Sequence, residues 1–70
     1  MSKFNVWQNK NWRIAFHYTI QIVLIYDKKS SYLVGFHNNN GLHYFSGVKP
    51  FPKHIQKKAE YYYKIRKLLP

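Results

Sequence analysis

Apolar and polar residues alternate along the first third of the chain. Every even position from 14 to 26 is apolar, whereas the odd positions begin as polar residues. Alternation with a period of two, rich in β-branched side chains, is typical of a strand that buries one face. The pattern predicts one long strand, straight or bent, over Trp12 to Tyr26. Val23 and Ile25 make its far end apolar on both sides, which is typical of a central strand.

Two shorter strands follow. The segment Asp27-Lys28-Lys29-Ser30 is rich in residues that bond their own backbone, and it predicts a turn. We expect strands over Ser31 to His37, with Tyr32, Val34 and Phe36 on one face, and over Leu42 to Ser46. The pair Asn40-Gly41 between them tolerates the positive φ of a tight hairpin.

After a break that contains Gly47, Pro50 and Pro52, the apolar period changes from two to that of a helix. The residues on one helical face are, in order, Ile55, Ala59, Tyr62, Ile65 and Leu69. Pro52 suits the first turn of a helix, because its missing N–H needs no partner there. The pattern therefore predicts a helix from Lys53 towards the C-terminus.

These elements predict an α+β fold, a three- or four-stranded antiparallel β-meander with one C-terminal α-helix packed on one face. The 70 residues make one small domain. Residues 1–11 supply either an extra strand, over Phe4 to Trp7, or a flexible arm. We expect the even positions from Ile14 to Leu24 to face the helix. In that arrangement Ile22→Asp would bury an unpaired carboxylate and prevent folding.

Positive charge is the strongest compositional feature. Twelve Lys and Arg residues stand against only Asp27 and Glu60, which gives a net charge of +10. This imbalance favours a polyanionic partner, which means a nucleic acid, an anionic membrane surface or an acidic protein. An AT-rich genome also encodes Lys and Asn heavily, but that bias accounts less easily for the scarcity of acids.

The composition also excludes several kinds of site. There is no cysteine, so neither disulfides nor thiolate chemistry is available. The histidines show no recognised metal-ligand spacing, and we expect neither a metal site nor a cofactor. The most apolar stretch, residues 14–26, is shorter than the roughly 20 residues of a membrane-spanning helix and contains His17, Thr19 and Gln21. With no signal pattern at the N-terminus, we expect a protein of the cytoplasm or of an organellar matrix.

The C-terminal third is the candidate binding surface. It contains one acid, Glu60, and seven basic residues: Lys49, Lys53, Lys57, Lys58, Lys64, Arg66 and Lys67. A stripe opposite the apolar helix face would run through Lys53, Lys57, Lys64 and Lys67. Such a stripe can follow a phosphate backbone and displace its condensed counterions, with Lys28 and Lys29 of the turn adjoining it. The alternative is a solvated face that only keeps the protein soluble.

The run Tyr61-Tyr62-Tyr63 lies in the same segment. Consecutive helical residues are about 100° apart, so the three rings cannot all face inward. We expect one ring in the core and the others exposed or bordering the sheet. Where exposed beside lysines, Tyr61 and Tyr63 can stack on unpaired bases. The alternative is that these rings wall the core of a small domain.

Four histidines offer an enzymatic alternative. A small ribonuclease could use His17, His37 or His43 as a general base, with a lysine beside the phosphate. The basic amphipathic helix could instead lie on an anionic membrane, although its narrow apolar face is needed to cover the sheet.

Residues 22–48 resemble the β-meander of the KTSC family. The matching positions are Ile22, Tyr26, Asp27, Tyr32, Leu33, Phe36, Gly41, Tyr44, Phe45 and Val48. The segment Tyr61 to Arg66 is similar to that family's Tyr-Phe-Asn-x-x-Ile-Arg ending, whereas Pro50, Pro52 and lysines replace the residues usual in the linking helix. The resemblance implies a small RNA-associated module without catalysis.

We therefore expect a non-enzymatic module that binds nucleic acid, with RNA favoured over DNA. Ribosome-associated proteins and small phage or mobile-element proteins have this composition. The first alternative is an interaction or inhibitor protein that covers an acidic surface of a host or defence protein. The second alternative is the histidine-dependent ribonuclease.

Overall fold

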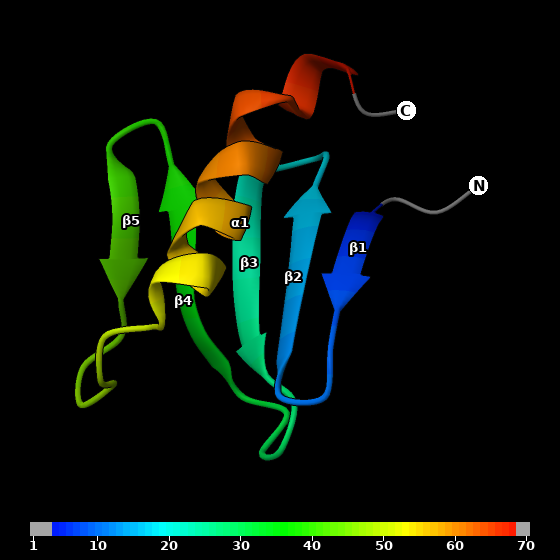
Figure 1. Ribbon diagram of the computed structural model, residues 1–70. Coiled ribbons are helices and arrows are strands. Elements are labelled where there is room, and N and C mark those ends of the chain that lie inside the picture. Colours follow the sequence, from blue (N-terminus) through cyan, green and yellow to red (C-terminus); the bar gives the residue numbers. More distant parts are fainter. Residues whose placement is uncertain (1–3, 69–70) are drawn as a thin grey trace.

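Five strands form one antiparallel sheet, and a helix lies across one of its faces (Figure 1). The computed structural model describes residues 4–68, with side-chain surroundings for residues 7–67. The elements are β1 (Phe4–Gln8), β2 (Trp12–His17), β3 (Ile22–Asp27), β4 (Leu33–Asn38), β5 (Gly41–Tyr44), α1 (Lys53–Lys64) and the 3₁₀ turn η1 (Arg66–Leu68).

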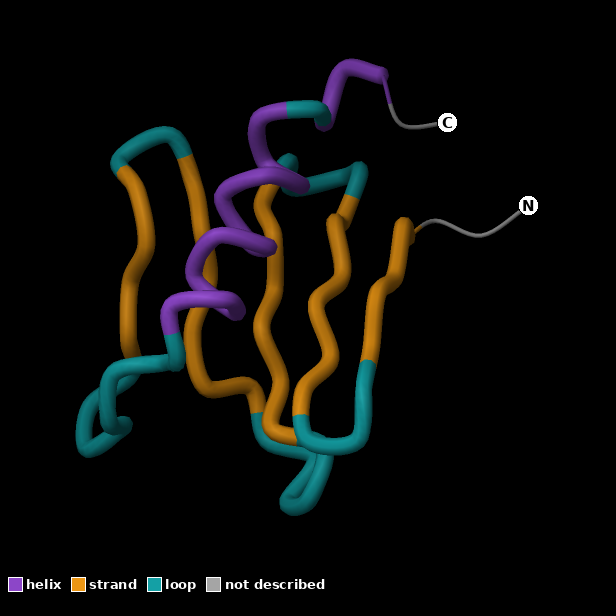
Figure 2. The backbone as a smooth tube through the Cα atoms, in the orientation of Figure 1, coloured by secondary structure: helices purple, strands orange, loops and turns teal. Residues whose placement is uncertain are grey.

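Strands that are consecutive in the chain are neighbours in the sheet, whose order is β1-β2-β3-β4-β5. Each pair is antiparallel and is joined by a short loop at one end of the sheet (Figure 2). This confirms the predicted α+β meander with a C-terminal helix, although the sheet has five strands rather than three or four. The extra strand predicted over Phe4 to Trp7 is present as β1.

The long strand predicted over Trp12 to Tyr26 is wrong, because residues 18–21 form a turn that separates β2 from β3. Gln21 adopts a positive φ of 59°, and its backbone N–H donates to the His17 carbonyl at 2.8 Å. A straight strand of that length would span about 50 Å, whereas the longest dimension of the molecule is 31 Å. Alternation continues through the turn residues, which is why the pattern conceals the turn.

The turn changes which positions face the helix. Residues opposite each other in antiparallel strands share a face, and Ile14 of β2 lies opposite Ile25 of β3. Odd positions of β3 therefore join even positions of β2 on the helix side. The expected placement of the even positions up to Leu24 is wrong beyond β2, since Ile20 is exposed and Ile22 and Leu24 lie on the other face. The expectation that Ile22→Asp prevents folding therefore loses its basis, because Ile22 is only half-buried and does not face the helix.

The core lies between the sheet and the helix. Its buried members are Ile14, Phe16, Val23, Ile25, Phe51, Ile55 and Ala59. Phe51 comes from the connection before the helix, and its ring centroid lies 5.3 Å from that of Trp12 and 4.6 Å from that of Tyr44. Burying one ring of this size stabilises the fold by about 1.5–3 kcal/mol.

Gly35 of β4 makes room for that ring. A Cβ at this position would lie 2.6 Å from the carbonyl oxygen of His43 and 2.8 Å from Cζ of Phe51. The carbonyl belongs to the paired strand β5 and cannot move without disturbing the sheet. A glycine is therefore required where two backbones and an aromatic ring approach this closely.

The helix α1 begins at Lys53, as predicted. Pro52 directly precedes it, and the Pro52 carbonyl accepts hydrogen bonds from the N–H groups of Ile55 and Gln56 at 3.0 and 3.1 Å. Ile55 and Ala59 are buried, which confirms the predicted apolar face, and Leu69 lies outside the described residues. Within residues 4–68, no helix is both long and apolar enough to cross a membrane.

Candidate nucleic-acid interface

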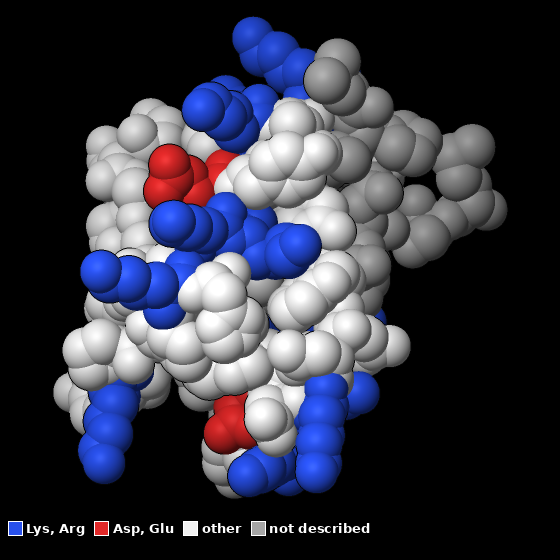
Figure 3. All heavy atoms as spheres, in the orientation of Figure 1, with Lys and Arg blue, Asp and Glu red and all other residues white. Residues whose placement is uncertain are grey.

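The outward side of α1 carries a row of lysines (Figure 3). Lys53, Lys57 and Lys64 are exposed, and their positions lie within about 40° of one another around the helix axis and about 16 Å along it. The buried Ile55 lies on the other side of the helix. The three ammonium groups therefore face solvent together, and the exposed carboxylate of Glu60 lies between Lys57 and Lys64 in the same row.

Two other basic residues named from the sequence pack on aromatic rings. Lys58 is half-buried, and its Nζ lies 5.0 Å from the centroid of the Trp7 ring on β1. The Arg66 guanidinium lies 4.0 Å from the Tyr63 ring and donates from Nη1 to the Tyr63 carbonyl at 2.8 Å. A cation at a helix C-terminus stabilises it by about 0.3–1 kcal/mol. Part of the positive charge thus supports the fold, while Lys67 in η1 is exposed.

Further lysines gather at the end of the sheet where α1 begins (Figure 1). Lys28 and Lys29 are exposed in the β3–β4 turn, and Lys49 is exposed in the connection to the helix. Lys10 of the β1–β2 connection, which the sequence pattern did not single out, is exposed at the same end. The meander brings these connections together because β1, β3 and β5 all end there. This end of the molecule extends the positive surface beyond the helix.

The three consecutive tyrosines point in different directions. Tyr61 is 55% exposed and lines a shallow hollow with Lys57 and Lys64. Tyr62 packs against the core. Tyr63 is half-buried, with its ring centroid 4.9 Å from that of His37. Of the two tyrosines named as stacking candidates, Tyr61 presents its ring to solvent and Tyr63 is engaged with the sheet.

The sheet separates the histidines that could serve a ribonuclease. His37 faces α1, whereas His17 on β2 and His43 on β5 belong to the opposite face. Because β3 and β4 lie between β2 and β5, His17 and His43 are separated by at least about 14 Å across the sheet. The His43 ring stacks on Phe36 with centroids 4.9 Å apart. No group of three His, Asp or Glu side chains in the described part of the chain could hold a metal ion.

The imidazole of His37 lies partly buried between β4 and α1. Burial lowers the pKa of its imidazole, while the charge of Glu60 and a hydrogen bond with the Asn38 backbone act in the opposite direction. It lines a hollow of about 500 Å³ between the β4–β5 turn and α1, together with Gln56 and Tyr63. A neutral imidazole at this place adds nothing to the positive surface at neutral pH.

The sheet face opposite α1, hereafter the open face, is not covered by any element of residues 4–68 (Figure 2). The strand register assigns to it the described side chains Gln8, Arg13, Ala15, His17, Ile22, Leu24, Tyr26, Leu33, Phe36, Asn38, His43 and Phe45. Most are apolar or aromatic, whereas a solvated sheet face is normally polar. The sequence does contain a signal for this apolar face. Residues 22–25 of β3 are all apolar, so their side chains make both faces of the sheet apolar at this strand.

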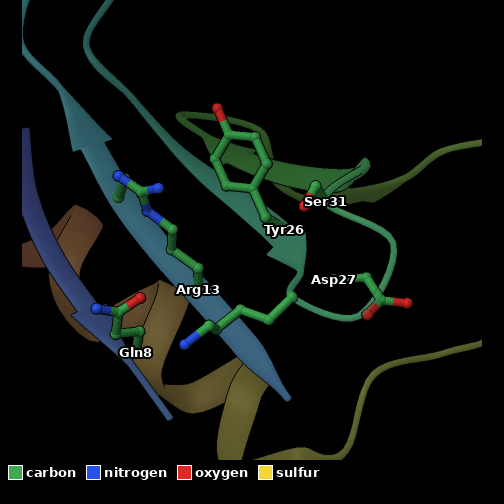
Figure 4. A pocket seen from close by; sticks show the side chains of 7 residues that line it. Gln8, Arg13, Tyr26, Asp27 and Ser31 are labelled. Atoms are coloured by element: carbon green, nitrogen blue, oxygen red, sulfur yellow. The ribbon is translucent and has the colours of Figure 1, made fainter. Parts of the chain in front are cut away.

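One end of the open face contains a hollow of about 290 Å³ (Figure 4). Gln8, Arg13 and Tyr26 project beside it from three adjacent strands. The guanidinium carbon of Arg13 lies 5.9 Å from the centroid of the Tyr26 ring. The remaining lining residues are Ala15, Asp27, Lys28 and Ser31. The hollow therefore combines two cations, one carboxylate, an amide and one aromatic wall.

Comparisons with protein-family models, with curated proteins and with solved structures find no match for this chain. The similarity of residues 22–48 to the KTSC family therefore stays a prediction from the sequence. In the structure these residues form β3, β4 and β5 with their connections. What the protein binds has to be inferred from its surface chemistry.

Proposed function

We propose that the protein is a non-enzymatic nucleic-acid-binding module with a preference for RNA. The observation that supports this proposal is the exposed row of Lys53, Lys57 and Lys64 along α1, in a chain with a net charge of +10. A nucleic acid that binds such a row releases condensed counterions, and their release drives association. The preference for RNA rests on the resemblance of residues 22–48.

The surroundings of the row extend the proposed contact. The exposed Tyr61 ring lies beside Lys57 and Lys64, where it can stack on a base next to a bound phosphate. Lys49 and the turn lysines lie beyond the N-terminal end of α1 and lengthen the path of positive charge. A phosphate backbone can therefore follow the helix and continue over the end of the sheet.

Neutralising the row is expected to weaken binding to all sequences alike. In the triple variant Lys53→Gln, Lys57→Gln, Lys64→Gln, the slope of log K against log salt concentration should become shallower. The expected change is about 0.7 per lost contact on single strands and about 0.9 on duplex. Fluorescence anisotropy of labelled oligonucleotides over a range of KCl concentrations measures it. The fold should survive, because exposed substitutions usually cost under about 0.5 kcal/mol each.

The matched control replaces the same three lysines by arginine, which preserves the charge and should preserve the slope. A glutamine variant that binds as tightly as the parent would show that the row is only a solvated face. A parent that binds no RNA or DNA, and instead binds an acidic protein in a salt-sensitive way, would favour the interaction or inhibitor alternative. Cleavage of labelled RNA that depends on His17, His37 or His43 would establish the ribonuclease.

A further inference from the structure

The open face carries a preformed aromatic cluster. The Phe36 ring stacks on His43 at an interplanar angle of 23°, and its centroid lies 6.0 Å from that of Phe45. Phe45 is 39% exposed, so part of this side chain faces solvent. Neighbouring rings already restrict these side chains, and a ligand that packs on them would pay little additional rotamer entropy.

A second aromatic position lies across the same face. Tyr26 of β3 is half-buried beside Arg13, at the hollow that Gln8 and Lys28 also line. Asp27 also lines this hollow and carries a negative charge, but its side chain points away from Arg13 (Figure 4) and accepts a hydrogen bond from the Lys29 backbone N–H at 2.8 Å. The hollow therefore offers a ring for a base, and a guanidinium and an ammonium for a phosphate.

The two aromatic positions are close enough to stack on bases of a single nucleic-acid strand. Phe36 lies opposite Leu24, and Tyr26 is the next residue of β3 on the same face. A register shift between Ile25 and Tyr26 sets Tyr26 opposite Leu33, and two residues of rise plus one spacing between strands put Phe36 and Tyr26 roughly 8 Å apart. The rings therefore form a track from β5 to β3 that ends at the cations of the hollow.

Charge decides between the possible occupants of this track. A second copy of the chain would bring another net charge of +10 to a surface that already carries Arg13 and Lys28. Unpaired nucleotides offer the reverse, since each supplies a flat apolar base for a ring and an anionic phosphate for a cation. In a duplex the bases are already stacked and paired, so they cannot reach the rings.

We infer that the open face is a second binding surface, which stacks unpaired bases of the nucleic acid that α1 holds by its phosphates. This inference rests on the proposed function. A strand that contacts both surfaces must bend around a molecule only 20 Å thick. Duplex DNA, with a persistence length of about 150 base pairs, resists such a bend, whereas a single strand follows it easily. The protein should therefore prefer single-stranded nucleic acid.

The test measures binding by fluorescence anisotropy to three probes of one sequence, namely single-stranded RNA, single-stranded DNA and duplex RNA. Both single strands are expected to bind at least about tenfold more tightly than the duplex. Phe45→Ala and Tyr26→Ala should each weaken single-strand binding about tenfold, the order of loss expected when one base-stacking ring is removed. The comparison of RNA with DNA shows whether the 2′-hydroxyl contributes.

The matched control is Ile20→Ala, which removes a side chain that is 53% exposed in the β2–β3 turn, away from the open face. It should bind like the parent. Circular dichroism checks that each variant is folded. If Phe45→Ala does not fold, Phe45→Leu keeps the aliphatic packing but removes the aromatic surface, and it should show the same loss of affinity.

Three results separate the possible failures. If single strands and duplex bind equally and the aromatic variants bind like the parent, while the lysine-to-glutamine triple variant is weakened, the inference fails and the proposed function stands. If no probe binds, both fail. If the parent is a dimer by light scattering and Phe45→Ala is a monomer, the open face joins two copies and the inference is overturned.

Discussion

Two residues, Gly35 and Phe51, determine how closely β4 and β5 pack against the connection to the helix. Gly35 lacks the Cβ that would meet the His43 carbonyl, and the ring of Phe51 occupies the space beside it. Neither role follows from periodicity, because Phe51 stands between two prolines outside any regular element. Their contact depends on residues 16 positions apart in the chain, which the fold brings together.

His37 should make stability depend on pH. Its folded-state pKa is lowered, chiefly by burial, while the unfolded chain titrates near about 6.5. The unfolded state therefore binds a proton more readily, so stability is fully present above about pH 6.5 and is lost as the pH falls towards the folded-state pKa. We expect the thermal midpoint of the parent to drop over this window, and His37→Phe to reduce the drop.

The matched control for this measurement is His54→Gln, because His54 is exposed on α1. Thermal unfolding followed by circular dichroism at several pH values compares the three proteins. The slope against pH is the quantity of interest, since His37→Phe also changes the packing against Tyr63. A variant whose slope equals that of the parent would assign the pH dependence to other groups.

Among the elements, the β2–β3 turn has the largest consequence. It places odd positions of β3 against the helix and even positions on the open face. Even and odd positions of β3 are both apolar, so the sequence pattern alone does not decide which of the two sets faces the helix. The hydrogen bond between the Gln21 N–H and the His17 carbonyl closes the turn and sets the register.

Two adjacent substitutions test this register. Val23 is fully buried on the helix side, whereas Ile22 is half-exposed on the open face. Val23→Asp should abolish cooperative unfolding, because an unpaired buried carboxylate costs several kcal/mol against a total stability of about 5–15 kcal/mol. Ile22→Asp should remain folded and lose only about 1 kcal/mol. Urea denaturation measures both, and the opposite order would mean that the register is wrong.

The helix combines two uses of positive charge. Lys58 packs on the Trp7 ring of β1 and Arg66 packs on the Tyr63 ring at the C-terminal end of α1, whereas Lys53, Lys57 and Lys64 are exposed. Counting basic residues in the sequence does not distinguish these groups. Their separation depends on where the rings of Trp7 and Tyr63 lie in the folded chain.

For the whole molecule, the excess of positive charge should oppose folding. The chain carries twelve basic residues and only two acids, and its described part folds into a body of 31 × 25 × 20 Å. Compaction increases the mutual repulsion of these charges. Salt shortens the screening length from about 10 Å at 0.1 M to about 3 Å at 1 M. Adding KCl is therefore expected to raise the thermal midpoint, by about 4–8 °C for each kcal/mol of repulsion relieved.

The lysine-to-glutamine triple variant serves as the comparison for this measurement. It carries three fewer positive charges, so its midpoint should rise less with KCl than that of the parent. A parent midpoint that stays constant or falls with KCl would show that repulsion is a negligible part of the stability of this fold.

Local pattern was sufficient for the fold class, for the helix start at Lys53 and for the lysine row opposite Ile55 and Ala59, because period and residue type are properties of a continuous segment. The split of the predicted long strand, the position of Phe51 over Gly35 and the apolar open face were not accessible in this way. Each depends on which residues lie opposite one another across strands and against the helix. Pairing is set by long-range packing, and a shift of one residue exchanges the two faces of a strand.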